Sequence, residues 1–371
     1  MADTTVMSKS LGVVIVAACA AALALMTASA SASTGCALVA SPSGSDTAAG
    51  SAAAPLRSAQ KLVDALQPGE TGCLRGGTYV GDVTMRSRSA TLTSYPGETA
   101  RLVGRLWVPG DGDTIRGLEL DGRNAANLPS PSINGDDVTF SDDDVTNDHT
   151  AICFDIGSHT WGIAHNTVIE RNRIHDCGVL PPQNHNHGIY LQAAYDTQIV
   201  WNLIYNNADR GIQLYPDAQD TVIAHNVVND NGEALDISGA DGTASSNSDI
   251  YDNLLTNSRV RYDVQSWYPS GNPVGRNNRV HNNCIWGGAM GTVETVGGGF
   301  TSRQNTVANP RYVDAAAANF ALRGQSPCAS LAGDIASVVA GTKTVAQATS
   351  LRTGRRRPLF TLTLDWRPPR W

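Results

Sequence analysis

The chain has 371 residues, of which only 16% are charged, and its formal net charge is -7 at pH 7. This length suits one large solenoid or two ordinary domains. The excess of 34 acidic over 27 basic residues argues against general nucleic-acid binding, and 36 glycines suit a turn-rich β-protein.

The N-terminal segment has the features of a secretory signal peptide. Lys9 precedes an apolar run over residues 11–26, and small residues such as Ala28, Ala30 and Ala32 follow it as cleavage sites. The run is short for a membrane span. We therefore expect residues 1–32 to be removed, the protein to be secreted or cell-surface associated, and no membrane contact to remain.

Six cysteines lie outside this signal, and an even number in an exported protein indicates disulfides. Zinc is a weaker interpretation, because no CxxC or HxxxH spacing occurs. The pairing that we favour follows the order of the sequence: Cys36–Cys73, Cys153–Cys177 and Cys284–Cys328.

Residues 33–70 are expected to form an N-terminal segment and a short helix. The stretch SAQKLVDAL, residues 58–66, has apolar residues at helical spacing, and Ser58 is a suitable N-cap. The next stretch, QPGETGCLRGGTYVGDV, is expected to begin a strand-rich region over residues 71–330. A solenoid of strands needs a cover at its open end, and the helix is the natural candidate.

Six similar segments follow one another between residues 138 and 285. They read VTFSDDDV, VIERNRI, QIVWNLI, VIAHNVV, DIYDNLL and RVHNNCI, each with a small polar residue two positions before its last apolar residue. These polar residues are Asp143, Asn172, Asn202, Asn226, Asn253 and Asn283, at steps of 29, 30, 24, 27 and 30 residues. Such a period indicates a solenoid, and the lack of helix-length segments between repeats makes it a β-solenoid.

The repeated polar position has a structural explanation. Coils of a β-solenoid stack about 4.8 Å apart. Asparagine tolerates the left-handed backbone of a sharp corner, and its amide can donate to the matching amide on the next coil. We therefore interpret these residues as a ladder at left-handed corners and not as active-site groups.

The capping segment, the repeats and the ladder resemble right-handed parallel β-helix proteins of the pectin-lyase-like kind. The resemblance covers about residues 36–330, and ANPRYVDAAAANFALRGQSPC resembles the ending of such helices. It implies an all-β fold, a single-stranded right-handed parallel β-helix with a short N-terminal capping helix. That fold hosts lyases, glycoside hydrolases, epimerases and inactive binding proteins.

A second strand follows each ladder corner, and four of these strands align at residues 150–155, 187–192, 210–215 and 233–238. Alternation points Ile152 and Phe154, Ile189 and Leu191, Ile212 and Leu214, and Leu235 and Ile237 inward. The outward residues then form three columns. These are Thr150, His187, Arg210 and Glu233; Cys153, Tyr190, Gln213, Asp236 and Asp263; and Asp155, Gln192, Tyr215 and Ser238.

The first column suggests elimination chemistry. Arg210 can pair with Glu233 and should depress the pKa of His187, which leaves a neutral imidazole that can act as a base. In β-elimination from a uronate sugar, Arg210 would neutralise the carboxylate and His187 would remove the proton. Tyr190 would serve as acid, base or donor, and Asp236 would support the site. Alternatively, these are ordinary surface residues on a polar sheet.

The second column allows other chemistry. Asp236 and Asp263 on adjacent coils would lie about 5 Å apart, which is the separation used by retaining glycosidases. The same pair could bind Ca²⁺. No other cofactor is expected.

Three insertions are expected to flank this face, at residues 178–186, 239–247 and 266–277. Trp267 and Tyr268 could stack on sugars, beside Gln192, Gln213 and Tyr215. The motifs of polygalacturonases (NTD, GDD, GHG and RIK) are incomplete here, and the RxPxxR motif of the main pectate lyases is missing. No lysine lies in the coils. No catalytic residue is therefore carried over from the resemblance.

We expect a monomer that acts on an extracellular polysaccharide, most of all a uronate-containing one, by elimination. Hydrolysis by Asp236 and Asp263 is the first alternative, and a non-catalytic carbohydrate-binding or cell-surface solenoid is the second. Neither nucleic acid nor membrane is an expected partner. Residues 331–371 are expected to form a basic, disordered tail.

Overall fold

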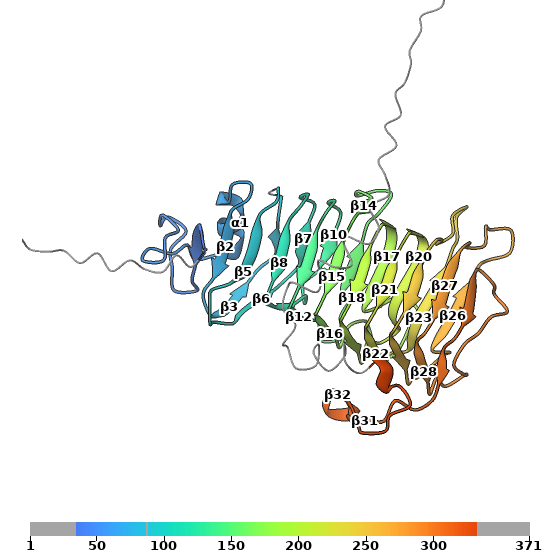
Figure 1. The fold of residues 1–371 in the computed structure, drawn as a ribbon. Helices are drawn as coiled ribbons and strands as arrows, with labels where there is room; N and C mark the ends of the chain where they lie inside the picture. Colours follow the sequence, from blue (N-terminus) through green and yellow to red (C-terminus); the bar gives the residue numbers. More distant parts are fainter. Residues whose placement is uncertain (1–34, 87, 332–371) are drawn as a thin grey trace, which may run out of the picture. The chain divides into compact units, whose positions relative to one another are not determined.

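The computed structural model describes residues 35–86 and 88–331, and Figure 1 shows them as stacked coils of parallel strands. Each full coil contributes one strand to each of three sheets, here called sheets A, B and C. The predicted right-handed parallel β-helix is confirmed. The predicted signal peptide and nearly all of the predicted tail lie outside the described residues.

Sheet A contains eleven parallel strands. Its strands, in order, are β1 (Leu38–Ala40), β2 (Thr71–Leu74), β5 (Thr91–Ser94), β8 (Thr114–Arg116), β11 (Thr139–Ser141), β15 (Val168–Glu170), β18 (Gln198–Val200), β21 (Val222–Ala224), β24 (Asp249–Tyr251), β27 (Asn278–His281) and β29 (Phe300–Arg303). Strands of the repeated segments therefore hydrogen-bond directly to one another from coil to coil.

Sheet B follows sheet A in each coil and contains ten strands. They are β3 (Gly77–Val80), β6 (Ala100–Val103), β9 (Glu119–Asp121), β12 (Asp144–Thr146), β16 (Arg173–His175), β19 (Leu203–Tyr205), β22 (Val227–Asn229), β25 (Leu254–Thr256), β28 (Cys284–Trp286) and β30 (Thr306–Val307). The ladder residues lie at the corner between sheets A and B.

Sheet C completes the coil and carries the candidate site. Its order is β26 (Val264–Trp267), β23 (Glu233–Ser238), β20 (Arg210–Gln219), β17 (Ile189–Tyr195), β13 (Phe154–Ile156), β10 (Ser132–Ile133), β7 (Leu106–Val108) and β4 (Val83–Thr84), and β14 (Ala164–His165) pairs with β17. Strands β17 and β20 are the longest in the sheet, so the face is widest there.

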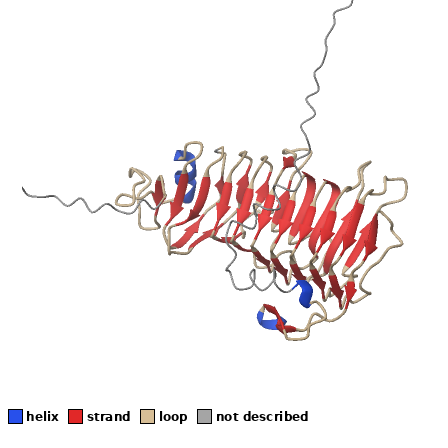
Figure 2. Ribbon diagram, viewed as in Figure 1, coloured by secondary structure: helices blue, strands red, loops and turns tan. Residues whose placement is uncertain are grey.

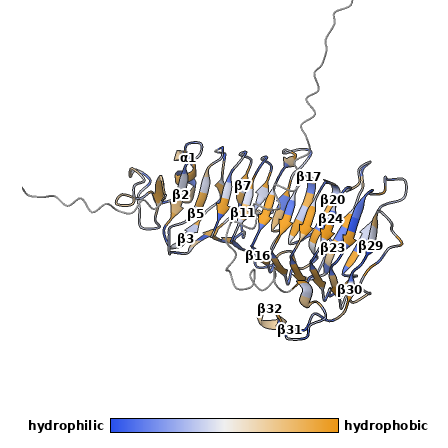
Figure 3. Ribbon diagram, in the orientation of Figure 1, coloured by the Kyte–Doolittle hydropathy of each residue, from blue (hydrophilic) through white to orange (hydrophobic). Residues whose placement is uncertain are grey.

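The core is the inside of the coils. Ile189, Ile212 and Leu235 pair in register and are fully buried, as predicted from strand alternation. Hydrophobic residues concentrate on the strands, whereas the connecting turns are mostly hydrophilic (Figure 3). Burial of this continuous apolar stack at about 25 cal/mol per Å² is the main stabilising contribution.

The predicted ladder is present, but its backbone conformation was predicted wrongly. The side-chain amide of Asn202 donates to Asn226 Oδ1 at 3.0 Å, and that of Asn226 donates to Asn253 Oδ1 at 2.9 Å. The left-handed residue is the one before each rung, for example Trp201 and His225. The corner residue turns the chain, which leaves the buried Asn free to align its amide with the next coil.

A seventh rung and a second ladder were not predicted from the sequence. Asn305 accepts from the amide of Asn283 at 3.1 Å. At the corner between sheets B and C, Asn207 donates to Asn231 Oδ1 at 2.8 Å. This second ladder fixes the level at which the strands of sheet C begin.

The predicted capping helix is confirmed as α1 (Ala59–Ala65), the only α-helix among the described residues (Figure 2). Leu62 and Val63 of α1 are buried in the core. Ser58 Oγ accepts a hydrogen bond from the Lys61 backbone N–H at 3.2 Å, as expected of an N-cap. No helix in the described part of the chain is long and apolar enough to cross a membrane.

We expect Ser58→Ala to lower the free energy of unfolding by about 1 kcal/mol, because the helix loses its N-cap acceptor. Denaturant titration followed by circular dichroism measures this loss. Ser43→Ala, at an exposed serine of the N-terminal segment, is the control and should leave stability unchanged. Equal stability of the two variants would contradict a capping role.

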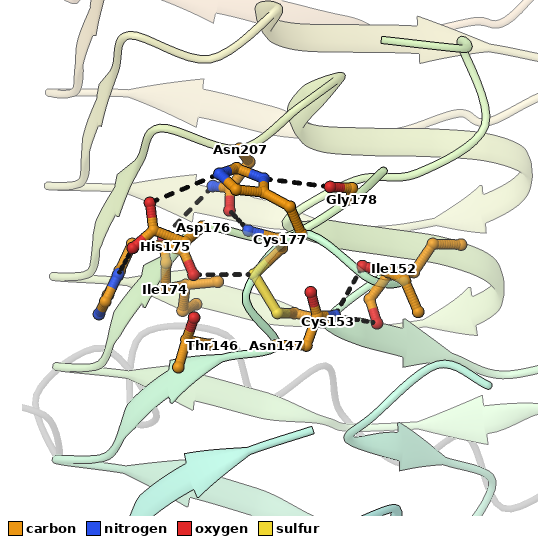
Figure 4. The surroundings of a disulfide bond; sticks show 12 residues. Thr146, Asn147, Ile152, Cys153, Ile174, His175, Asp176, Cys177, Gly178 and Asn207 are labelled. Carbon is orange, nitrogen blue, oxygen red and sulfur yellow. Dashed lines mark hydrogen bonds and ion pairs between the residues drawn. A yellow bond between two sulfur atoms is a disulfide. The ribbon is translucent and has the colours of Figure 1, made fainter. Parts of the chain in front are cut away.

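All three predicted disulfides are present: Cys36–Cys73, Cys153–Cys177 and Cys284–Cys328. Figure 4 shows that Cys153–Cys177 joins the residue before β13 to the start of the 178–186 insertion. The Cys177 backbone N–H also donates to Asn207 Oδ1 at 3.0 Å. The insertion that flanks sheet C is therefore anchored covalently and through the second ladder.

The described chain ends in a small antiparallel hairpin, β31 (Tyr312–Asp314) and β32 (Asn319–Leu322), with 3-10 turns η1 (Ala315–Ala317) and η2 (Ala329–Leu331). Phe320 is fully buried and packs with Leu203, Val227 and Leu254, which point outward from sheet B. The hairpin therefore covers an apolar stripe on sheet B, away from the sheet C face.

Candidate functional site

The candidate site lies on the outer face of sheet C, on strands β13, β17, β20, β23 and β26. Tyr190, Gln213 and Asp236 form one column, because β17, β20 and β23 pair in that register. The predicted column is confirmed for these three residues. Gln265 of β26 continues it opposite Asp236.

The predicted pairing of Asp236 with Asp263 is wrong. Asp263 lies one residue before β26 and is fully buried. Its carboxylate accepts backbone N–H groups of Ser258 at 3.0 Å and Gly288 at 2.9 Å. Asp263 is therefore a structural residue that ties two turns together. The structure provides neither the glycosidase pair nor the calcium pair that Asp236 and Asp263 were predicted to form.

The predicted alignment of residues 150–155 is also wrong, by two residues. Asp155 pairs with Tyr190 and so lies in the same column as Gln213 and Asp236. Cys153 and Thr150 lie before β13, at the corner. The left-handed pair Asp148 and His149 lengthens this corner, which displaces the strand relative to its neighbours.

Arg210 is the centre of a buried ionic cluster. Its Nε lies 3.1 Å from Glu233 Oε2 and 3.4 Å from Asp236 Oδ2, and all three side chains are at most 5% exposed. Asp236 also accepts from Gln213 at 2.9 Å and from Ser238 at 2.6 Å. The predicted Arg210–Glu233 pair is confirmed, but Arg210 is occupied by two carboxylates and cannot freely clamp a third.

His187 precedes β17 and is only 3% exposed. Burial, reinforced by the charge of Arg210, holds the pKa of His187 well below its usual value, in the predicted direction. The Arg210 backbone N–H donates to His187 Nδ1 at 3.4 Å, which leaves Nε2 as the protonated nitrogen of the neutral ring. The His187 and Tyr190 ring centroids lie 5.5 Å apart, so the neutral imidazole packs against the Tyr190 ring.

Asp155 and Tyr190 are the half-buried ionisable pair on the open face. Burial raises the pKa of Asp155 to about 7, against the opposing charge of Arg105. Burial also raises the pKa of Tyr190, although a hydrogen bond with Gln192 opposes this. Near neutral pH, Asp155 therefore exists in both forms while Tyr190 keeps its proton. This combination suits one base and one acid.

Aromatic rings form a row along the same face. The Tyr190 and Tyr215 ring centroids lie 6.3 Å apart, and those of Tyr215 and Trp267 also lie 6.3 Å apart. Trp267 is 52% exposed, whereas the hydroxyl of Tyr268 is buried. Tyr268 therefore supports the loop, and the exposed stacking surface is the row from Tyr190 to Trp267.

Among residues 35–86 and 88–331, no group of three or more His, Cys, Asp or Glu side chains is arranged to hold a metal ion. Asp155 was predicted to face outward, but in the third column and not as a catalytic candidate. Aligning the buried pair Phe154 and Ile156 with Ile189 and Leu191 would have placed it beside Tyr190.

The stacked coils define a parallel β-helix protein, and the outer face of sheet C is polar and aromatic. Residues 131–324, more than half of the chain, match the family described as right handed beta helix region, so the chain belongs to this family. Comparison with curated proteins finds no match.

Two solved structures share the fold. The pectate lyase Pel9A superimposes with a TM-score of 0.55 at 14% identity, over 80% of this chain and 92% of its own. XylC in its complex with xylose superimposes with a TM-score of 0.54 at 12% identity, over 73% of this chain and 69% of its own. At these identities the likeness concerns the fold alone.

Proposed function

We propose that the outer face of sheet C binds an extracellular polysaccharide containing uronate sugars and cleaves it by β-elimination. The observation that carries the proposal is the half-buried Asp155–Tyr190 pair at the end of an aromatic row. Sugar rings pack on aromatic faces, and acid–base chemistry needs a group whose pKa lies near the working pH. The similarity to a pectate lyase and to a protein bound to xylose supports a sugar polymer as the ligand.

The residues have distinct roles in this proposal. Asp155 removes the proton from the carbon next to the uronate carboxyl group, and the released electron pair forms a carbon–carbon double bond. The bond to the leaving oxygen breaks, and the Tyr190 hydroxyl supplies its proton. The proton taken by Asp155 later returns to Tyr190. His187, whose ring lies against that of Tyr190, is a positioning residue, and Arg210, which contacts Glu233 and Asp236, holds His187 in place through its backbone N–H.

Elimination fits the carboxylates better than hydrolysis does. A hydrolase needs two accessible carboxyl groups about 5–10 Å apart. Asp155 and Asp236 are separated by three strand steps, which is about 14 Å at the usual strand spacing. Glu233 lies nearer to Asp236, but both are 1% exposed and bound to Arg210.

The three disulfides support export, because such bonds persist in oxidising compartments. A secreted protein would meet its polymer outside the cell. The burial of His187, Arg210, Glu233 and Asp236 also favours a second candidate function, a carbohydrate-binding solenoid without catalysis.

The test is incubation of the disulfide-intact protein with pectins, alginates and glycosaminoglycans, followed by ultraviolet absorbance and reducing-end assays. Elimination gives an absorbing unsaturated sugar together with new reducing ends. Reducing ends without absorbance would contradict elimination. Retention of a polymer on the protein with no product would favour the binding solenoid instead.

A further inference from the structure

A small cavity of about 210 Å³ opens beside the buried ionic cluster, where the strands of sheet C begin. Residues 182–184 of the first insertion form one wall, and Val260 and Arg261 form another. Arg210 and Glu233 form its inner end. The cavity thus lies at the start of β20 and β23, on the same sheet as the aromatic row and separate from it.

Glu233 presents an unused polar atom at this inner end. Its Oε2 is bound to Arg210, but its Oε1 is buried and has no hydrogen-bond partner among the described residues. A buried polar atom without a partner calls for an explanation, and a group supplied by a ligand is one. Glu233 is 1% exposed and lines the cavity, so this atom is shielded from bulk solvent.

The charged side chains around the cavity differ in how many hydrogen bonds and ion pairs they form. Asp209 accepts backbone N–H groups of Asn184, His185 and Asn186 at 2.8–2.9 Å, and Arg210 is held by two carboxylates. Arg261, which is half-buried, forms no salt bridge with another described residue and acts on Glu233 only through space. It is the cation available to a ligand at the mouth.

The size of the cavity limits what it can take. Pockets for drug-sized ligands have volumes of about 300–1,000 Å³, so this one suits a single sugar ring and not a length of polymer. Hydroxyl groups of such a ring can satisfy Glu233 Oε1, since a protonated or ionised carboxyl group hydrogen-bonds to hydroxyls in either state. An anionic group on the ring would complement Arg261.

We propose that this cavity binds one sugar unit carrying an anionic group, as a branch or end of the polymer, and that Arg261 selects for the charge. The inference rests on the proposed function for the identity of the ligand, but it concerns a separate subsite and a separate residue. Glu233 contacts the ring hydroxyls, and Arg261 contacts the anionic group.

The test is calorimetric titration of the intact protein with galacturonate, glucuronate and mannuronate, each compared with galactose, glucose or mannose. Within each pair the sugars differ at C6, where the acid carries a carboxylate. We expect at least one acid to bind about tenfold or more tightly than its neutral partner. Arg261→Gln should remove this difference, and Arg261→Lys should keep part of it. Arg116→Gln, an exposed arginine of sheet A, is the matched change in net charge and should have no effect.

Equal binding of both members of every pair, or unchanged preference in Arg261→Gln, would overturn the charge selection. Failure of all six sugars to bind would overturn the subsite itself. The outcome is separable from the proposed function: unsaturated products from a polymer without monosaccharide binding would refute only the subsite. Binding of a uronate without any unsaturated product from the polymers would refute only the elimination.

Discussion

Asn226→Asp is expected to destabilise the protein by about 3 kcal/mol at neutral pH, because a buried carboxylate loses donors that the amide supplies. The Asn226 amide donates to Ile199 O at 2.8 Å, Ala224 O at 3.1 Å and Asn253 Oδ1 at 2.9 Å. An ionised aspartate at this rung would place negative charge against all three oxygens.

The reverse substitution should stabilise the protein. Asp143 occupies the first of the predicted rungs, where it is 2% exposed and its Oδ2 has no partner among the described residues. Asp143→Asn would restore an amide donor, and we expect a gain of about 1–2 kcal/mol at pH 7. The carbonyl of Ile115, which pairs with Phe140, is the counterpart of the oxygens bound by the later rungs.

The gain should depend on pH. Burial raises the pKa of Asp143 well above its usual value, so the folded state keeps a proton that the unfolded state releases at about pH 4. Stability therefore falls as pH rises above about 4, and Asp143→Asn removes this loss. Thermal unfolding at pH 4 and pH 8 measures the difference.

Asp252→Asn provides the control, since Asp252 makes the left-handed turn just before a rung and does not occupy one. Its free energy of unfolding should stay within about 0.5 kcal/mol of the parent's at both pH values. If Asp143→Asn showed the same small effect, or stabilised equally at pH 4 and pH 8, the aspartate would not be held in its protonated form.

Tyr190→Phe is expected to lower kcat/KM on the polymer at least about 100-fold, because it removes the hydroxyl that protonates the leaving oxygen. Asp155→Asn should lower it by a similar or larger factor. In the parent protein, kcat/KM should rise with pH through about 7, since only the ionised form of Asp155 can accept the proton. The absorbance assay, followed from pH 5 to pH 9, measures both effects.

Tyr195→Phe is the matched control on the same strand. The Tyr195 hydroxyl donates to Asp217 Oδ2 at 2.8 Å, away from the Asp155–Tyr190 pair. The change in atoms is identical, and activity should be retained. Comparable losses in Tyr190→Phe and Tyr195→Phe would mean that a packing effect, and not proton transfer, explains the result.

Much of the fold was predictable because the same physical requirement recurs at every coil. Each rung needs a buried amide, so Asn202, Asn226 and Asn253 mark their corners in the sequence itself. The cap at Ser58 was predictable from the local helical pattern, and the three disulfides from the even number and the order of the cysteines. Asn305 was missed because its strand, β29, carries Thr301, Ser302 and Arg303 in place of apolar residues.

The site was harder to predict because it depends on the lengths of corners. Extra left-handed residues before β13 move Asp155 into line with Tyr190, and an irregular turn at residues 257–263 moves Asp263 inward. Neither change alters the apolar pattern of the strands. The sequence also gives no sign that Arg210 is enclosed by two carboxylates, because Asp236 reaches it from the neighbouring column.

The ladder also gives the solenoid a dipole along its stacking axis. In the bonds between rungs, every amide from Asn172 to Asn283 donates toward the C-terminal end, and its Oδ1 accepts from the N-terminal side. The same amides also donate back to carbonyls of the preceding coil. Their dipoles therefore add along the stacking axis, as peptide dipoles add in an α-helix. The negative pole falls at Asp143, where a carboxylate would be repelled, and the positive pole falls at Asn305. A neutral group at the first rung is thus favoured by the whole column, and not only by its immediate neighbours.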